Sequence, residues 1–294
     1  MSEVLTASRN RPSDARLFGL VDAAARPERI HGLLKDSGAA FRSLYAGLPE
    51  EEAGPASLYI VRIKDRKADW AEALSQVDLH TPCLSLIWSR VDLDSLVTHL
   101  QAFLFADIGD NMTAMVRYFD PRNIEAVLGA WGKEVSGMFM SPIEQWLYRG
   151  RYPDWQRIRN ESHADSRICR SIVTRLEETE IDALMAHTEP DELLATLVES
   201  GVVDCERPYV ERFADFIPRY RQAVQWGISE PADRLIFCQY SYLYGEAFDQ
   251  HFFINDLLVL AKHTGESFRE AVLRVPAGAW AQIEHARKHQ LAVS

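Results

Sequence analysis

The pattern of apolar and polar positions changes part-way along the chain, and its first part alternates between short apolar runs and helical spacing. Four runs predict strands, over residues 17–21, 58–63, 84–88 and 112–119. Between them, apolar residues recur every three or four positions and predict helices that begin near Pro27, near Asp92 or Asp94, and at Asp120-Pro121. Because strands alternate with helices, we expect a mixed, partly parallel sheet covered by helices.

From about residue 165 the spacing becomes helical almost throughout. Apolar residues between 168 and 181 predict one helix, and a second is expected to begin at Pro190. The stretch from Tyr209 to Val224 predicts a third helix, which Pro218 must kink or divide. Further helices are predicted over residues 231–246, 250–263, 266–274 and 277–290. We therefore predict an α+β protein of two lobes, an N-terminal α/β lobe over residues 1–160 and an all-α C-terminal bundle over residues 161–294.

Charge also distinguishes the two lobes. The chain has 32 Lys and Arg against 43 Asp and Glu, a formal net charge of −11. Residues 1–160 hold 19 basic and 21 acidic side chains, whereas residues 161–294 hold 13 and 22. A nucleic-acid binder, or a protein held on anionic lipid, needs a basic surface, so this balance argues against both classes.

The four cysteines lie at least 33 residues apart, so none of them has the close spacing of a structural zinc site. His285 and His289 share a helix face and could hold a metal, but no third ligand is evident; we expect neither metal nor cofactor. Scattered thiols are typical of a reducing compartment. No apolar run reaches the roughly 18 residues of a membrane helix, and the first residues lack the apolar core of an export signal. These features predict a cytoplasmic protein.

Motifs of catalysis are missing from the sequence. It contains no GxSxG, no phosphate loop of Walker type and no GxGxxG. Two pairs of carboxylates, Asp92 with Asp94 and Asp107 with Asp110, flank predicted strand ends, where catalytic acids often lie in folds of this type. Helix capping and turn formation explain the same residues without a substrate. We predict no catalytic residue, with a small-substrate hydrolase or transferase that uses these carboxylates as the alternative.

The segment 117–122, Arg-Tyr-Phe-Asp-Pro-Arg, is the most distinctive in the N-terminal lobe. We expect Asp120 to cap a helix that begins at Pro121, with Arg117 and Arg122 close enough to form ion pairs with it. The alternative is an anion clamp, because guanidinium groups suit phosphate or carboxylate.

Aromatic residues are concentrated in the C-terminal lobe. The 45 positions from Tyr209 to Phe253 hold 12 of the chain's 30 Phe, Tyr and Trp residues, on more than one face of the predicted helices. Core packing explains many of them, but Tyr and Trp also serve as anchors in protein interfaces. The predicted partner-binding residues are Tyr220, Trp226, Tyr242 and Phe248.

Several segments, taken in order, resemble one known family. They are residues 20–24, 43–47, 56–61, 88–90, 116–122 and 139–143, followed by Trp146. They are similar to the opening domain of the type VI secretion effector adaptors, chaperones called Tap or TEC and formerly catalogued as a domain of unknown function. The similarity spans roughly residues 17–150, and the spacing Arg-x-x-Asp-Pro-Arg after a strand is its most specific part. It implies structural roles for Trp88, Arg117, Asp120, Pro121 and Arg122.

The resemblance implies a function as well. Such adaptors are cytoplasmic, non-enzymatic proteins that bind a specific toxic effector and load it onto VgrG, the trimeric protein of the secretion spike. An acidic surface would steer basic segments of a client protein towards the adaptor. Besides the enzyme described above, an immunity-type protein that binds a toxin to neutralise it is a further alternative.

Overall fold

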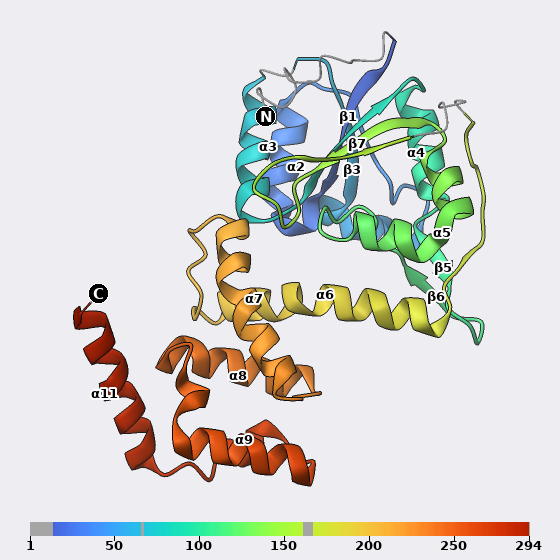
Figure 1. Ribbon diagram of the computed structural model, residues 1–294. Helices are drawn as coiled ribbons and strands as arrows, with labels where there is room; N and C mark the ends of the chain where they lie inside the picture. The colour runs from blue at the N-terminus through green and yellow to red at the C-terminus, as the bar shows by residue number, and fades with distance from the viewer. Residues whose placement is uncertain (1–13, 66–67, 161–166, 294) are drawn as a thin grey trace. The chain divides into compact units, whose positions relative to one another are not determined.

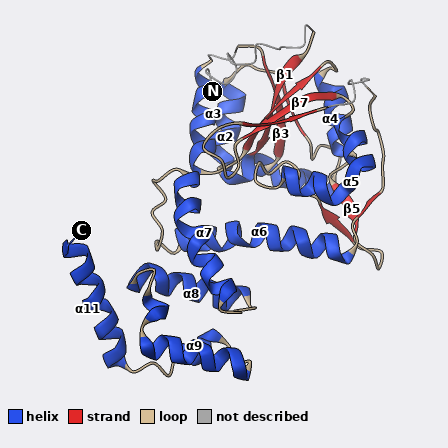
Figure 2. Cartoon of the chain, in the orientation of Figure 1, coloured by secondary structure: helices blue, strands red, loops and turns tan. Residues whose placement is uncertain are grey.

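The computed structural model describes residues 14–65, 68–160 and 167–293, and it confirms an α+β protein. The chain divides into two compact units, residues 1–187 with 208–210 and residues 188–207 with 211–294. Strands lie in the first unit only, among the described residues, and the second is built from helices (Figure 2). The sequence placed the boundary at residue 160, but the first unit continues to residue 187. It does so because Leu176 is buried in its core and Ile172 and Ile181 pack against that core.

A six-stranded sheet forms the centre of the first unit (Figure 1). In spatial order its strands are β2 (Phe41–Ser43), β3 (Leu58–Ile63), β1 (Arg16–Asp22), β4 (Leu84–Ser89), β7 (Ile143–Tyr148) and β8 (Gln156–Arg159). Every neighbouring pair in this sheet is antiparallel, so the expectation of parallel pairing is wrong here. The reason is topological. The connection from β3 to β4 includes a helix, as in a parallel unit, but β1 lies between these strands and pairs with both.

Helices cover both faces of this sheet, because the side chains of its strands alternate between two cores. On β1, Phe18 and Leu20 face one core, whereas Leu17 and Val21 face the other. The first core is completed by helices α4 (Leu93–Gln101) and α5 (Ile124–Met140), and the second by α2 (Pro27–Asp36) and α3 (Asp69–His80). Two 3-10 helices, Ala23–Ala25 and Pro49–Ala56, lie in the connections.

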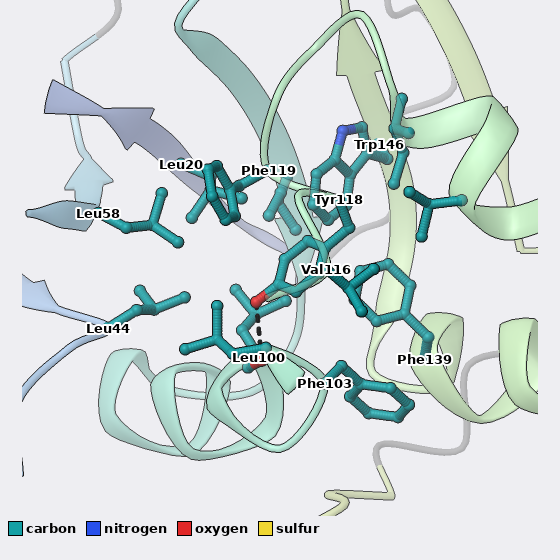
Figure 3. Packing of buried hydrophobic residues seen from close by; sticks show 14 of the residues in the cluster. Leu20, Leu44, Leu58, Leu100, Phe103, Val116, Tyr118, Phe119, Phe139 and Trp146 are labelled. Carbon is teal, nitrogen blue, oxygen red and sulfur yellow. Dashed lines mark hydrogen bonds between the residues drawn. The ribbon is translucent and has the colours of Figure 1, made fainter. Parts of the chain in front are cut away.

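Aromatic rings fill the first core (Figure 3). Tyr118 and Phe139 lie in contact, with ring centroids 5.0 Å apart, and Phe103 and Trp146 pack on Phe139 at 5.2 and 5.6 Å. The buried Tyr118 hydroxyl donates a hydrogen bond to the Leu100 carbonyl oxygen at 2.7 Å, so its polar group is satisfied inside the core.

Three short strands form a second sheet in the order β6 (Thr113–Met115), β5 (Phe105–Asp107), β9 (Thr174–Arg175). Strands β5 and β9 pair in parallel. All other pairs of strands that the structure describes are antiparallel. The predicted helix over residues 168–181 is therefore wrong, because 167–173 are not helical and β9 follows. Apolar residues at 168, 172 and 176 are spaced by even numbers, which places them on one side of an extended chain as well.

The second unit contains the later helices and a core of its own. These helices are the end of α6 (Glu178–Glu199), most of α7 (Tyr209–Gln225), α8 (Pro231–Tyr244), α9 (Phe252–Thr264), α10 (Phe268–Val272) and α11 (Ala277–Val293), with a 3-10 helix at Phe248–Gln250. The predicted helices of this part are confirmed within a few residues. Pro190 does not begin a helix, since α6 continues through it, and α7 likewise continues through Pro218. Among the described residues, no helix combines the length and apolar character that crossing a bilayer requires.

Candidate functional site

The 117–122 segment folds into a turn around a buried carboxylate, Asp120. The Arg122 guanidinium donates two hydrogen bonds to it, from Nε at 2.8 Å and Nη2 at 2.7 Å, and the Arg122 backbone N–H donates a third at 3.0 Å. Burial by itself would raise the pKa of Asp120, but the Arg122 guanidinium holds that pKa below its ordinary value. The predicted ion pair is confirmed. The predicted cap is wrong, because α5 begins at Ile124 and residues 120–123 form a turn before it.

Two further charged residues complete this cluster, which we call the Asp120 cluster: Asp22, Arg117, Asp120 and Arg122. Arg117 Nη2 lies 3.6 Å from Asp120 and 3.8 Å from Asp22 at the end of β1, and the Arg117 side chain is 52% exposed. Burial raises the pKa of Asp22, against the opposing effects of the Ala24 N–H and of Arg117. Arg117 is therefore loosely bound between two carboxylates, while Arg122 makes close, two-point contact with Asp120.

Residues that follow β7, together with His187, lie against the turn that contains Asp120. Gly150, directly after β7, has a φ of +56°, and a Cβ there would lie 2.5 Å from the Pro121 carbonyl oxygen. The His187 ring bonds the Arg122 carbonyl oxygen through Nε2 at 2.9 Å, and Arg151 donates to the His187 carbonyl oxygen at 2.6 Å. The turn is thus approached closely by Gly150 and bonded by His187, and Arg151 in turn bonds His187. Trp88, for which the resemblance also implies a structural role, is buried on β4 in the second core.

The strand-end carboxylates have structural partners of their own. Asp92 is the N-cap of α4 and accepts from the Ser95 N–H at 2.8 Å and the Ser95 hydroxyl at 3.1 Å, which lowers its pKa. Asp94 pairs with exposed Arg42 at 3.0 Å. Asp107 accepts from the Gly109 N–H at 2.8 Å in the turn after β5. Asp92 and Asp107 thus take the capping and turn-forming roles that the sequence favoured, whereas Asp94 forms an ion pair.

The predicted partner-binding residues form contacts within the second unit. Trp226 donates from Nε1 to Asp249 at 2.7 Å, and Tyr242 donates to Asp215 at 2.9 Å while Arg219 lies over its ring. Tyr220 has Arg234 5.9 Å from its ring centroid. All three remain half-buried.

Phe248, the fourth predicted partner-binding residue, is buried. It is only 2% exposed and packs on Phe237 in the core of the second unit. Its assignment to a binding surface is wrong. In a sequence, aromatic density does not separate core rings from exposed ones.

Among the surface cavities that the described residues form, we consider two, one in each unit. The larger, about 510 Å³, is lined by residues around Met138 and Cys169, and the smaller, about 240 Å³, lies between Trp226, Asp233 and Lys262. Neither is lined by a member of the Asp120 cluster or by the strand-end carboxylates.

Metal-ligating side chains are scattered in the part of the chain that the structure describes. His, Cys, Asp and Glu residues form no group of three there that could hold a metal ion. His285 is exposed, and the side chain of His289 lies outside the described residues. All four cysteines are free thiols.

Sequence reasoning missed one surface, the outer face of α9. Phe252, Val259 and Leu260 are exposed there. The signal was present in the sequence, since residues 252–261 are apolar at eight of ten positions, more than one buried helix face requires.

Comparison with known proteins identifies one domain. Residues 17–136 match the family model described as a domain of unknown function, DUF4123. The chain carries a DUF4123 domain. This domain extends from β1 into α5 and includes the whole Asp120 cluster. No curated protein and no solved structure matches the chain.

Proposed function

We propose that this protein is a non-enzymatic adaptor, which binds a specific type VI secretion effector in the cytoplasm and loads it onto the VgrG spike. The DUF4123 domain carries the proposal. It covers five of the six segments on which the resemblance to the effector adaptors depends, including the 117–122 turn, whereas residues 139–143 and Trp146 lie beyond it.

The roles of the polar residues in this domain support a binding protein. Arg122 and Asp120 satisfy one another, and Asp92 and Asp107 satisfy backbone N–H groups. Groups committed in this way stabilise a scaffold, whereas a general acid or base must reach the proton that it transfers. The same residues would be the catalytic ones if the chain were a hydrolase or transferase.

The C-terminal part of the chain has the charge that suits a client-binding surface. Residues 161–294 hold 22 acidic and 13 basic side chains. Such a surface accelerates encounter with basic segments of another protein and disfavours acidic ones.

Co-purification tests the proposal. The tagged protein is co-expressed with the products of adjacent reading frames that encode a VgrG protein and a large toxin, and complexes are sized by light scattering after gel filtration. We expect a stoichiometric complex that contains both proteins. Its interfaces should bury about 1,200–2,000 Å² of accessible surface or more, as stable protein complexes do. Failure to capture either protein would refute the adaptor function.

Two further measurements separate the adaptor from the alternatives. An immunity-type inhibitor would protect cells that express the toxin without the spike, whereas an adaptor leaves them poisoned. An enzyme would turn over a small substrate, with activity lost in Asp92→Asn or Asp120→Asn.

A further inference from the structure

Helix α9 exposes an apolar stripe along one side (orange-red in Figure 1). Its residues are Phe252 (57% exposed), Phe253 (36%), Asp256, Val259 (42%) and Leu260 (47%), hereafter the α9 stripe. At about 100° per residue these five positions fall within an arc of about 120°, and they cover roughly two turns of the helix. The stripe is therefore a continuous face of one element.

The opposite side of α9 already has its partner. Ile254, Leu258 and Ala261 are buried, and the first two belong to the core of the second unit. A helix needs one apolar face to pack on its own domain. The second apolar face of α9 remains exposed in the folded chain. A group of apolar side chains on one exposed face is typical of an interaction site.

The N-terminal end of the stripe is aromatic. The rings of Phe252 and Phe253 lie 4.0 Å apart between centroids, and the His251 ring stacks on them at 5.0 and 6.0 Å. Aromatic side chains bring a large contact area with few rotatable bonds, which is why they dominate the energetics of interfaces.

Asp256 lies at the centre of the stripe, both along the helix and around it. No ion pair of Asp256 occurs among the described residues. In a symmetric pairing of two α9 helices, the carboxylate would meet its own copy, and like charges disfavour that arrangement. A partner that places a Lys or Arg opposite Asp256 gains an ion pair instead.

We propose that the α9 stripe is the docking surface for a basic amphipathic helix of the client effector, with a Lys or Arg on that helix opposite Asp256 and apolar residues on either side of it. The proposal rests on the adaptor function, for which it names the client-facing surface. It replaces Tyr220, Trp226 and Tyr242, whose polar groups and rings are engaged within the second unit.

The test uses the complete chain and the adjacent-gene toxin of the co-purification experiment. Val259→Ser/Leu260→Ser removes the apolar contacts and Asp256→Lys reverses the central charge. Leu273→Ser is the matched control, because Leu273 is 82% exposed in the same unit but lies outside α9. We expect the double variant and the charge reversal each to raise the Kd for the toxin at least tenfold, and the control to stay within twofold. Thermal melts of all three should match the wild type.

Peptides of about 20 residues that tile the toxin identify the segment that is bound. The expected peptide has a Lys or Arg between apolar residues at helical spacing, and it loses binding to Asp256→Lys. Equal toxin binding by wild type and both α9 variants would overturn the inference and leave the adaptor function standing. A segment without basic residues, or a wild-type dimer that Val259→Ser/Leu260→Ser converts to a monomer, would also overturn it. Absence of any toxin complex would refute the adaptor function, and the inference with it.

Discussion

Acid should destabilise this protein through one buried histidine, His99 on α4. Its Nε2 donates to the Phe139 carbonyl oxygen at 2.7 Å, and its Nδ1 accepts from the Cys169 backbone N–H at 3.0 Å. The bond from Cys169 requires a neutral ring, because a protonated ring would direct a second N–H at that of Cys169. Burial lowers the pKa of His99 to about 4, against an opposing effect of the Phe139 carbonyl.

The size and sign of the effect follow from linkage. In the unfolded chain a histidine has a pKa of about 6.5, so the unfolded state binds the proton first as the pH falls. The contribution of His99 is complete above pH 6.5 and is lost as the pH falls towards the folded-state pKa of about 4. At 1.36 kcal/mol per pKa unit, the loss relative to pH 7 is roughly 2 kcal/mol at pH 5 and roughly 3 kcal/mol at pH 4.

His99→Gln isolates this effect from the carboxylates, which titrate in the same range. Glutamine keeps one donor and one acceptor but does not ionise between pH 4 and 8. Urea unfolding of both proteins at half-unit steps from pH 7.5 to 4.5 gives the free energy of unfolding of each. We expect the difference between wild type and variant to shift by about 2 kcal/mol in favour of the variant as the pH falls. A difference that stays constant across this range would refute the reasoning.

Five other substitutions test the scaffold and the division between core and surface. Gly150→Ala should lower the free energy of unfolding by about 2 kcal/mol, because φ is +56° and the new Cβ would lie 2.5 Å from a carbonyl oxygen. Gly129→Ala, in α5 with open space around it, should be neutral or stabilising in the same urea titration. Arg122→Ala removes both guanidinium hydrogen bonds from the buried Asp120 carboxylate, with only the more distant Arg117 at 3.6 Å to replace them, and should cost about 3 kcal/mol. An unchanged urea midpoint would contradict this. Phe248→Ala should cost about 3–5 kcal/mol and lower the melting temperature, whereas Phe252→Ser should leave the melt unchanged.

Local patterns were sufficient to place several elements of the first unit, although the strand predicted over residues 112–119 is only β6 (Thr113–Met115). The run 58–63 became β3 with the same bounds, and Asp92 became the N-cap of α4 as one of two expected residues. Both depend on interactions within a few residues of the chain, and such interactions can be read from a sequence. Helix α3 and strand β7 were not predicted, although both contribute buried residues to the cores.

Strand pairing could not be derived in the same way. Strand β1 lies between β3 and β4 in the sheet. Hydrophobic periodicity predicts where a strand begins and ends, but it does not predict which strands are neighbours. The segment around Ile172 was assigned to a helix because even spacing fits both an extended chain and a helix. Its strand depends on a parallel partner, β5, about 70 residues earlier in the chain.

The candidate site shows the same difference between local and long-range interactions. Within 117–122, the ion pair of Arg122 with Asp120 joins residues two apart, so the sequence could predict it. Burial of Phe248 depends on contacts with Phe237 and other residues of a separate core, which residue type alone does not reveal. The sequence shows where aromatic residues are concentrated. Only the packing in the structure distinguishes exposed rings, which can anchor an interface, from rings buried in the core.

That distinction also decides which substitutions can report on client binding. Tyr242 donates to Asp215 and lies under Arg219, so its replacement would remove a hydrogen bond from a half-buried carboxylate and a ring contact from a buried cation. Loss of binding in such a variant would be inseparable from loss of structure. Val259 and Leu260 make no side-chain hydrogen bond and are 42% and 47% exposed, so removing their methyl groups takes less from the folded state than replacing a residue of the core. A change in affinity at these positions therefore measures the interface itself.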